Sequence, residues 1–370
     1  MTKLHPLRRL ALALVTAALL LPVSAVVGPS AAGASPTYQA PGTIDATGSQ
    51  DVTAALVAFI RSVPDGSTIT FPRGARYHTE STIAVGFRHD LVIDGAGAEF
   101  FATTDGSGAT PIGPSDVQWK WPRHRDQWVV YNSINVTLRN LTVRGPNPNA
   151  GLGDAAYVEA LEGQAAVEFF GTVNSRLENC SLSDTYGDFV YIGKDATGTV
   201  VRGCTMARSG RQGITVSDAQ NVLIDHNNIS YVRRTAIDLE PWTPEWAIQN
   251  VWIVNNTFGP TRLCILGAKG EGDVNNVVFA NNRMTGVPIR IKNTPLNGRR
   301  HDWFVIGNSS DRVYGSAHGA IWINRTDHVV VTGNYQALQS KRNPSQIATE
   351  FVGSTGVTLS GNQFPYVPYK

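Results

Sequence analysis

The chain has 370 residues, a formal net charge of +2 and charged side chains at only 16% of positions. Proteins that bind nucleic acid depend on a concentrated basic patch, so this balance argues against a nucleic-acid partner. Glycine is frequent, with 36 residues, and Asn, Thr and Val recur throughout. This composition favours an all-β protein with many turns.

Residues 1–34 are typical of a secretory signal peptide followed by a short leader. A basic region precedes an apolar region that is too short for a transmembrane span; these are Lys3, Arg8 and Arg9, and then Leu10–Val23. Cleavage is expected after Ala25 or Ala34. We therefore expect a secreted, extracellular protein, without membrane attachment after cleavage, that forms one domain over residues 36–370.

Residues 51–63 predict a helix, because their apolar residues follow helical spacing. These residues are Val52, Leu56, Phe59, Ile60 and Val63, with Asp51 as a candidate N-cap. The segment STITFPRG (67–74) then predicts the first strand of a series.

A short pattern recurs along the rest of the chain: an apolar residue, two variable positions, and then Asn or Cys. The Asn or Cys residues are Cys180, Cys204, Asn227, Asn256, Asn282, Asn308, Asn334 and Asn362, spaced by 24, 23, 29, 26, 26, 26 and 28 residues. Repeats of this length made of short strands predict a solenoid, here a β-helix whose coils stack at roughly 4.8 Å. The helix at 51–63 is expected to cap its N-terminal end.

The recurring Asn is expected at a tight turn, because Asn tolerates the left-handed conformation and its amide can bond to the Asn of the next coil. Cys180 and Cys204 share this column. We expect buried, reduced thiols there, with a disulfide between adjacent coils as the alternative.

Two segments carry a family resemblance: DATGSQDVTAALVAFIRSVPDGSTITFPRGARY (45–77) and LVIDGAGAEF (91–100). They resemble the N-terminal part of the pectin-lyase-like superfamily, which includes polygalacturonases and pectate-lyase-like proteins. The resemblance and the repeat together cover residues 40–364. They imply a single-stranded right-handed parallel β-helix, a fold that hosts hydrolases, lyases, epimerases and non-catalytic proteins.

One strand of each coil aligns as FVYIG (189–193), GITVS (213–217), AIDLE (236–240), PIRIK (288–292) and AIWIN (320–324). Alternate residues of a strand face opposite sides, so one face carries a column of polar residues. The outward residues are Tyr191, Thr215, Ser217, Asp238, Glu240, Arg290, Lys292, Trp322 and Asn324. The resemblance implies that this face is a polysaccharide-binding groove.

Long segments are expected to wall this groove, because long loops in a compact repeat fold are usually functional. They are residues 115–128, with Trp119, Trp121 and Trp128, residues 145–163, and residues 240–249, with Trp242 and Trp246. Arg208, Arg211, Arg233 and Arg234 precede the groove strands, and guanidinium groups bind carboxylates well.

The acids Asp238 and Glu240 are two positions apart on one strand, roughly 6.5–7 Å between Cα atoms. Like charges at this distance raise the pKa of one group, so one acid can serve as general acid and the other as general base, as in an inverting glycosidase. The same pair could instead bind Ca²⁺, with Arg290 or Lys292 as the base of a lyase. A solvated charge ladder is the structural alternative.

The polygalacturonase pattern of Asn-Thr-Asp, Asp-Asp, Gly-His-Gly and Arg-Ile-Lys is matched only in its last part, by Arg290-Ile291-Lys292. The preceding positions read Thr185-Tyr186-Gly187, Arg211-Gln212-Gly213 and Arg234-Thr235-Ala236. The resemblance therefore supports an acidic sugar ligand more than it supports that family's mechanism.

We therefore predict an enzyme that hydrolyses a polysaccharide, with an acidic one of the pectin or polyuronate kind expected and no cofactor. Asp238 and Glu240 are the predicted catalytic residues. The predicted substrate-binding residues are Arg290, Lys292, Tyr191, Arg211, Arg234, Trp322 and Trp242. The alternatives are a Ca²⁺-dependent lyase in the same groove, with Asp238 and Glu240 as metal ligands, and a non-catalytic glycan-binding or cell-surface protein.

Overall fold

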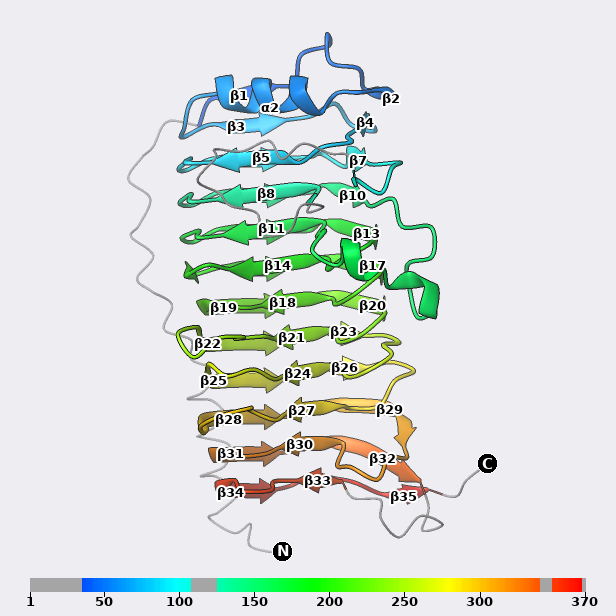
Figure 1. Ribbon diagram of the computed structural model, residues 1–370, viewed down its shortest axis with the longest axis vertical. Coiled ribbons are helices and arrows are strands. Elements are labelled where there is room, and N and C mark those ends of the chain that lie inside the picture. The colour runs from blue at the N-terminus through cyan, green and yellow to red at the C-terminus, as the bar shows by residue number, and fades with distance from the viewer. Residues whose placement is uncertain (1–34, 108–124, 340–347, 368–370) are drawn as a thin grey trace, which may run out of the picture. The chain divides into compact units, whose positions relative to one another are not determined.

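The computed structural model describes residues 35–107, 125–339 and 348–367. The unit that begins at Thr37 is a stack of coils, each made of short strands that belong to three parallel sheets (Figure 1). Each strand pairs with the corresponding strand one coil away, so every sheet runs along the stack. This arrangement confirms the predicted all-β solenoid.

Sheet A is formed by β1 (Thr37–Gln39), β3 (Thr68–Thr70), β6 (Val92–Asp94), β9 (Thr137–Arg139), β12 (Arg176–Glu178), β16 (Val200–Arg202), β19 (Ala219–Asp225), β22 (Ala247–Val254), β25 (Asp273–Ala280), β28 (Arg300–Ile306), β31 (Thr326–Thr332) and β34 (Thr355–Ser360), with β15 (Ala196–Thr197) beside β19. Sheet B is formed by β2 (Thr47–Asp51), β4 (Arg76–His78), β7 (Glu99–Phe101), β10 (Thr142–Arg144), β13 (Ser181–Thr185), β17 (Thr205–Ser209), β20 (Asn228–Val232), β23 (Thr257–Phe258), β26 (Arg283–Met284), β29 (Ser309–Tyr314), β32 (Tyr335–Gln339) and β35 (Tyr366–Val367).

Sheet C carries the candidate site. It is formed by β5 (Ile83–Gly86), β8 (Trp128–Tyr131), β11 (Val167–Phe170), β14 (Val190–Gly193), β18 (Ile214–Val216), β21 (Ile237–Leu239), β24 (Leu266–Ala268), β27 (Ile291–Asn293), β30 (Ile321–Ile323) and β33 (Thr349–Glu350). Their inward residues, such as Val190, Ile214 and Ile237, are fully buried.

The asparagine column is a continuous hydrogen-bonded ladder. The amide N–H of Cys204 donates to Asn227 Oδ1 at 2.9 Å, and Asn227 N donates to Asn256 Oδ1 at 2.9 Å. The same bond recurs in each later coil as far as Asn362. The predicted bond between coils is thus confirmed.

The predicted left-handed conformation, however, belongs to the residue before each member of the ladder. Asn281 precedes Asn282 with φ 55°, and Gly307 precedes Asn308 with φ 64°. The ladder residue itself turns inward and uses its side chain on neighbouring backbone groups. Its chemical role is therefore hydrogen bonding within the core, and the turn is made by its neighbour.

The two thiols of the ladder column stay free, as expected. Cys180 and Cys204 are buried, and Cys180 N donates to Cys204 Sγ at 3.4 Å. The two cysteines thus replace two asparagines at the N-terminal end of the ladder.

Helix α2 (Thr53–Ser62) lies over the first coil, and Leu56, Val57 and Ile60 are buried in the core (Figure 1). The N-cap position is Val52, one residue after the predicted Asp51. Asp51 still contributes, because its Oδ1 accepts the N–H of Thr53 at 3.0 Å. The predicted capping helix is therefore present.

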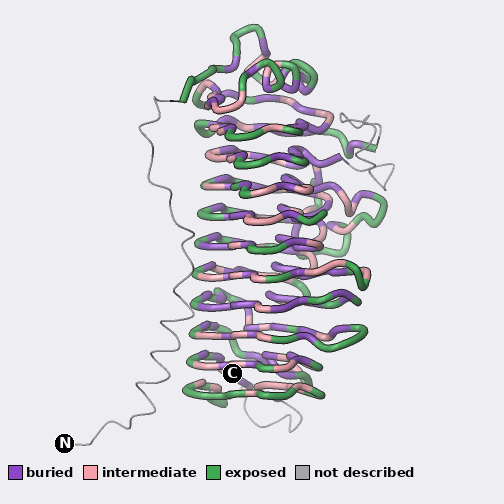
Figure 2. Tube along the Cα trace, turned by 90° about the vertical axis from the view of Figure 1, so that its left-hand side faces the viewer, coloured by how far each residue is buried: buried purple, intermediate pink, exposed green. Residues whose placement is uncertain are grey.

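Buried residues recur from coil to coil and form one core along the stack, except in the last coil, where β33, β34 and β35 have no buried residue (Figure 2). At the C-terminal end the inward residue Leu359 of β34 is 52% exposed, whereas its counterpart Val331 is buried. Among the described residues, no helix is long and apolar enough to cross a membrane.

Candidate active site

The register of sheet C places one column of outward side chains along the groove face. Its members, one per coil, are Glu168, Tyr191, Thr215, Asp238, Gly267, Lys292, Trp322 and Glu350. Adjacent strands are roughly 4.8 Å apart, so Lys292 lies about 10 Å along the column from Asp238. The predicted face with acids in one coil and a base two coils later is confirmed.

The predicted register of the segment PIRIK was wrong by two residues. Ile291, rather than Ile289, aligns with Ile237 through Leu266, so Lys292 stands in the column of Asp238. Arg290 precedes β27. The chain before β27 is irregular, with Ile289 N donating to the side chain of Gln336 at 2.6 Å, and this shifts the pattern.

A second column stands two residues before the inward residues Val190, Ile214, Ile237 and Leu266. Its members are Asp188, Gln212, Thr235 and Cys264. The residues that correspond to Arg211-Gln212-Gly213 in the preceding coil are thus 187–189, and the expected 185–187 was wrong. An acid, Asp188, therefore does stand at the start of this strand.

Three carboxyl groups from neighbouring coils meet around Arg211. Arg211 Nη1 donates to Asp188 Oδ2 and Nη2 donates to Glu240 Oε2, both at 2.8 Å. Gln212 Nε2 donates to Asp238 Oδ2 at 2.5 Å and lies 3.3 Å from Glu240 Oε1. We name Asp188, Arg211, Gln212, Asp238 and Glu240 the acid cluster.

The acid cluster is buried, and burial makes its three acids unlike. Burial and the neighbouring Glu240 charge raise the pKa of Asp238 well above its ordinary value, and Asp238 donates a hydrogen bond to Glu240. Burial is the largest influence on Glu240 and acts to raise its pKa, but the charge and hydrogen bond of Arg211, the hydrogen bond with Asp238 and the charge of Arg234 together make the net shift downward. The pKa values of Asp238 and Glu240 are therefore shifted in opposite directions.

The third acid, Asp188, is 2% exposed and also accepts from Thr215 Oγ1 at 2.6 Å and from Gln212 N at 3.0 Å. Burial raises the pKa of Asp188, and Arg211 offsets part of this shift. Asp238 and Glu240 are 9% and 7% exposed, which contradicts a solvated charge ladder on this strand.

An open pocket of about 140 Å³ begins at Cys264 and extends past Lys292 along the groove. It is lined by Leu263, Cys264, Arg290, Ile291, Lys292, Tyr314, Ser316, His318, Gly319, Ala320 and Trp322. Gly267 separates this pocket from Asp238: a Cβ there would lie 3.2 Å from Asp238 Oδ1 and 3.3 Å from Cys264 Sγ. Only the narrow space that the missing side chain of Gly267 leaves therefore separates Asp238 from the pocket.

Trp322 lines this pocket, and two side chains contact its ring. Lys292 Nζ lies 4.6 Å from the ring centroid, and the His318 ring stacks on it with centroids 4.2 Å apart. The contact with Lys292 is a cation–π interaction, which restrains the ammonium group beside the pocket.

The insertion at 145–163, with the short helices η1 (Asp154–Ala156) and η2 (Glu159–Leu161), is fixed to the edge of the groove. Asn147 is buried and donates to Ala156 O at 2.9 Å and to Thr185 O at 3.1 Å. Its acid Glu162 lies 3.5 Å from Arg211 Nε. The insertion is thus one wall of the groove, as predicted.

Three of the arginines that precede the groove strands are bound to this wall or to the acids. Arg234 lies over the Tyr157 ring, 5.4 Å from its centroid, and Arg233 pairs with Asp154 at 2.9 Å. Arg211 contacts the predicted catalytic acid Glu240 itself. Arg208 pairs with Asp184 at 2.6 Å on sheet B, away from sheet C.

The predicted tryptophans differ in their surroundings. Trp242 follows the acid strand and is 49% exposed, so it is available to a ligand. Trp128 is fully buried in β8, which contradicts its predicted place in a groove wall; an inward position in the strand pattern explains it. Trp119 and Trp121 lie outside the described residues.

Further titratable side chains lie on the same face of sheet C towards the N-terminus. Tyr191 is half-buried and hydrogen-bonds to Ser217, and burial raises its pKa. Two coils before Tyr191, the buried Asp126 hydrogen-bonds to Glu168, and burial raises the pKa of Asp126 to about 7. Sequence reasoning missed Asp126, whose only signal is its place two residues before Trp128, the position that Asp188 occupies before Val190.

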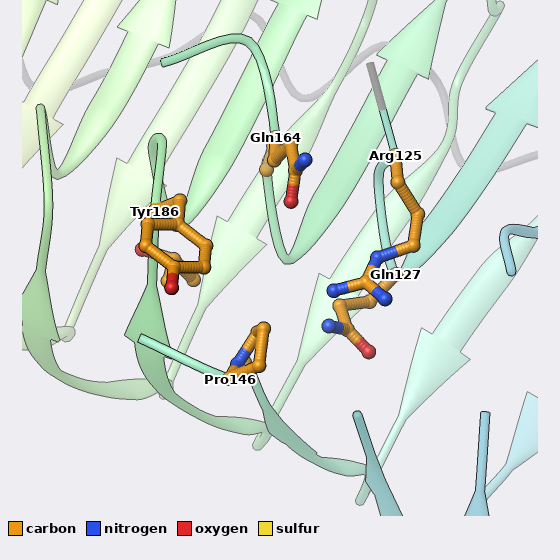
Figure 3. Close-up of a pocket in the computed structure, with 8 residues that line it drawn as sticks. Arg125, Gln127, Pro146, Gln164 and Tyr186 are labelled. Carbon is orange, nitrogen blue, oxygen red and sulfur yellow. The ribbon is translucent and has the colours of Figure 1, made fainter. Parts of the chain in front are cut away.

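A small pocket beside Asp126 is lined by Arg125, Gln127, Pro146, Gln164 and Tyr186, among others (Figure 3). Arg125 is buried and is held by Glu80 Oε2 at 3.1 Å and Thr104 O at 2.7 Å. Its charge is thus neutralised within the fold, and this pocket does not fit an anionic ligand.

The acid pair is a poor Ca²⁺ site, because its oxygens are already bound by nitrogen donors. Arg211 and Gln212 occupy both oxygens of Glu240 and one oxygen of Asp238. A hard cation needs several free oxygen ligands. Within the described residues, no group of three or more His, Cys, Asp and Glu side chains is arranged to hold a metal ion.

The family described as the right-handed beta helix region matches residues 123–287. No curated protein matches the chain by sequence. The solved structure of endo-xylogalacturonan hydrolase from Aspergillus tubingensis superposes with a TM-score of 0.60 and 14% identity, covering 90% of this chain and 93% of that one. The chain is a right-handed parallel β-helix.

Two further structures have the same fold. The family 28 exopolygalacturonase of Yersinia enterocolitica has a TM-score of 0.53 and 12% identity, covering 91% of this chain and 79% of that one. The alginate lyase of Paenibacillus sp. str. FPU-7 has a TM-score of 0.50 and 10% identity, covering 89% and 99%. The resemblance to pectin-lyase-like proteins is thus confirmed for the fold of this β-helix.

Proposed function

We propose that this β-helix is an enzyme that hydrolyses an acidic polysaccharide in the groove on sheet C. The observation that carries the proposal is a buried carboxyl pair, Asp238 and Glu240, whose pKa values are shifted in opposite directions and which lies one glycine away from a pocket lined by Arg290 and Lys292. Buried acids with pKa values shifted apart are the arrangement that acid–base hydrolysis requires.

In the proposed reaction Asp238 donates its proton to the glycosidic oxygen as the bond to the anomeric carbon breaks. In the free protein that proton is directed to Glu240, so the leaving oxygen takes the place of Glu240 as its acceptor. The freed Glu240 carboxylate accepts a proton from the water that bonds to the anomeric carbon. After product release, the proton passes back from Glu240 to Asp238.

Direct contact of the two carboxyl groups is closer than the 6.5–9.5 Å typical of ligand-free inverting glycosidases, so substrate must separate the pair. The position of the pocket supports this order of events. Cys264 and Gly267 connect the pocket to Asp238, which makes Asp238 the acid nearest to a bound sugar.

The proposed acidic substrate is supported by the charges of the pocket. Arg290 and Lys292 line it, and Lys292 is exposed, so a uronate carboxylate would find two cations there. Two structures of the same fold are named for action on xylogalacturonan and polygalacturonate chains, as hydrolases. The signal-like N-terminus supports an extracellular substrate.

The test uses the mature protein on a panel of acidic polysaccharides, with Ca²⁺ or with EDTA. New reducing ends and the ultraviolet absorbance of unsaturated uronates are followed together. We expect reducing ends without absorbance, unaffected by EDTA, and lost in Asp238→Asn and Glu240→Gln. Glu178→Gln, on sheet A away from the groove, is the matched control and keeps full activity.

Other outcomes would identify other functions. Absorbance that rises with the reducing ends would identify a lyase, for which the same fold in an alginate lyase and the basic pocket at Lys292 are the supporting observations. A Ca²⁺ requirement would contradict the poor fit of the acid pair to that ion. Binding without turnover on every polysaccharide would identify a non-catalytic glycan-binding protein.

A further inference from the structure

Arg211 and Gln212 precede β18 and stand where the resembled polygalacturonase pattern has two aspartates. Both side chains form hydrogen bonds to acids of neighbouring coils, so this position still has a defined role in the site. Arg211 contacts Asp188 and Glu240 at 2.8 Å, and its side chain is only 12% exposed. No ion pair links it to Asp238 among the described residues.

The orientation of the Gln212 amide is fixed by the backbone. Thr235 N donates to Gln212 Oε1 at 2.7 Å, so the oxygen is used and the nitrogen must face the acids. That nitrogen donates to Asp238 Oδ2 and lies beside Glu240 Oε1. Gln212 therefore holds the two acids in one place without adding a charge.

The charges of the cluster do not balance if all three acids are ionised. All three acids are buried, and the Arg211 guanidinium pairs with Asp188 and Glu240 but not with Asp238, in a site where an uncompensated carboxylate is costly. The two acids that contact the guanidinium are the ones best held as carboxylates. The proton is therefore expected on Asp238, the acid that lies next to Gly267 and the pocket.

We propose that Arg211 and Gln212 are positioning residues that assign the catalytic proton to Asp238. Arg211 keeps Asp188 and Glu240 ionised, and Gln212 fixes Asp238 against Glu240. The proposal rests on the proposed function for the roles of the two acids in catalysis. The assignment of the proton itself is a property of the free protein.

Other charged or titratable groups also face the cluster. Glu162 on the insertion approaches Arg211 Nε, and Arg234 acts on Glu240 from the next coil. Tyr191 lies beside the acids from β14, and Cys264 lies beside Asp238. Glu168 acts on Tyr191 from β11. None of these groups is a cation in contact with Asp188, so Arg211 is the cation on which the assignment depends.

The test is infrared spectroscopy of the free protein near neutral pH, with ¹³C-labelled aspartate or ¹³C-labelled glutamate to assign each protonated carboxyl band. In the wild type we expect an aspartic acid band that Asp238→Asn removes, and no glutamic acid band from the cluster. In Arg211→Gln a glutamic acid band appears, because Glu240 loses its cation. Arg208→Gln makes the same charge change on sheet B and leaves the spectrum unchanged.

Kinetics give a second readout. Loss of a cation within 4–6 Å raises a carboxyl pKa by about one to three pH units, so the acidic limb of the pH–rate profile moves up by that amount in Arg211→Gln. Gln212→Met lowers kcat with little change in KM. Should Arg211→Gln fail to fold, Arg211→Lys keeps the charge, and it retains the wild-type spectrum while kcat falls.

An Arg211→Gln spectrum equal to that of the wild type would overturn the proposal, as would a wild-type glutamic acid band lost in Glu240→Gln. A new glutamic acid band in the spectrum of Arg211→Lys would also overturn the proposal. These spectra need no substrate. The proton assignment can thus fail while the polysaccharide is cleaved, or hold while no polysaccharide is cleaved, which separates it from the proposed function.

Discussion

Gly267, between Asp238 and the pocket at Lys292, gives the sharpest test of where the substrate lies. Alanine at this position would place a methyl group 3.1 Å from Thr235 Cγ2, 3.2 Å from Asp238 Oδ1 and 3.3 Å from Cys264 Sγ. These contacts require shifts of a few tenths of an ångström, and the backbone is not left-handed here. The cost in stability should therefore be small, at about 1 kcal/mol, the lower end for overpacking.

The effect on catalysis should be larger, because the methyl group fills the path between the acid and the pocket. One methyl group that intrudes on a fitted sugar is worth about 1–3 kcal/mol, so we expect kcat/KM of Gly267→Ala to fall about 10- to 200-fold. Initial rates of reducing-end release measure this, and thermal unfolding measures stability.

Gly42→Ala is the matched control, because an added Cβ there meets nothing within 4 Å and the residue lies near the N-terminal end. It should leave both rate and stability unchanged. A wild-type kcat/KM in a folded Gly267→Ala would refute the proposed path of the substrate. A loss of several kcal/mol in stability would instead show that the site cannot relax, and that the lost activity is not steric.

Three further predictions concern the fold and the groove. Asn282→Ala leaves the N–H of Asn256 and a neighbouring carbonyl without partners, so chemical denaturation should show a fall of roughly 2–6 kcal/mol in the free energy of unfolding. Asn362→Ala, at the half-buried end of the ladder, should cost less, and equal losses would contradict the argument. Burial raises the pKa of Asp126 from 3.8 to about 7, so this group stabilises the fold fully below about pH 4 and loses that contribution as the pH rises to about 7. Asp126→Asn should flatten the plot of unfolding free energy against pH over this window, and an unchanged slope would refute the prediction. Trp322→Ala should raise KM by freeing Lys292, whereas Trp322→Phe should retain most of the affinity; equal effects of both would contradict a positioning role.

The repeat in the sequence was enough to predict the solenoid, because each coil repeats the same inward residues and the same ladder residue. It also placed Asp238 and Glu240 on an outward face, since a strand alternates its two sides. The register of neighbouring coils was less secure. A two-residue irregularity before β27 puts Lys292 in the column where Arg290 was expected, and no local pattern in the sequence marks it.

The composition of the acid cluster could not be predicted from single strands. Asp188, Arg211 and Gln212 precede their strands and are 28 to 52 residues from Glu240 in the sequence, so only the stacking of coils brings them together. The same holds for Trp322, whose ring contacts a lysine of the neighbouring coil and a histidine of the loop before β30.

The cost of the acid cluster is itself an argument for its use. Elsewhere outward charges form exposed pairs, such as Arg299 with Asp327, whose side chains are both 44% exposed and which cost the fold little. Asp188, Asp238 and Glu240 are instead buried around one guanidinium, at a desolvation penalty of several kcal/mol for each ion. A solenoid does not need such a cluster for stability, because its neighbouring coils have Gly or Thr at the same column. Buried acids kept at that cost, beside a cationic pocket, are the expected signature of a site that transfers protons.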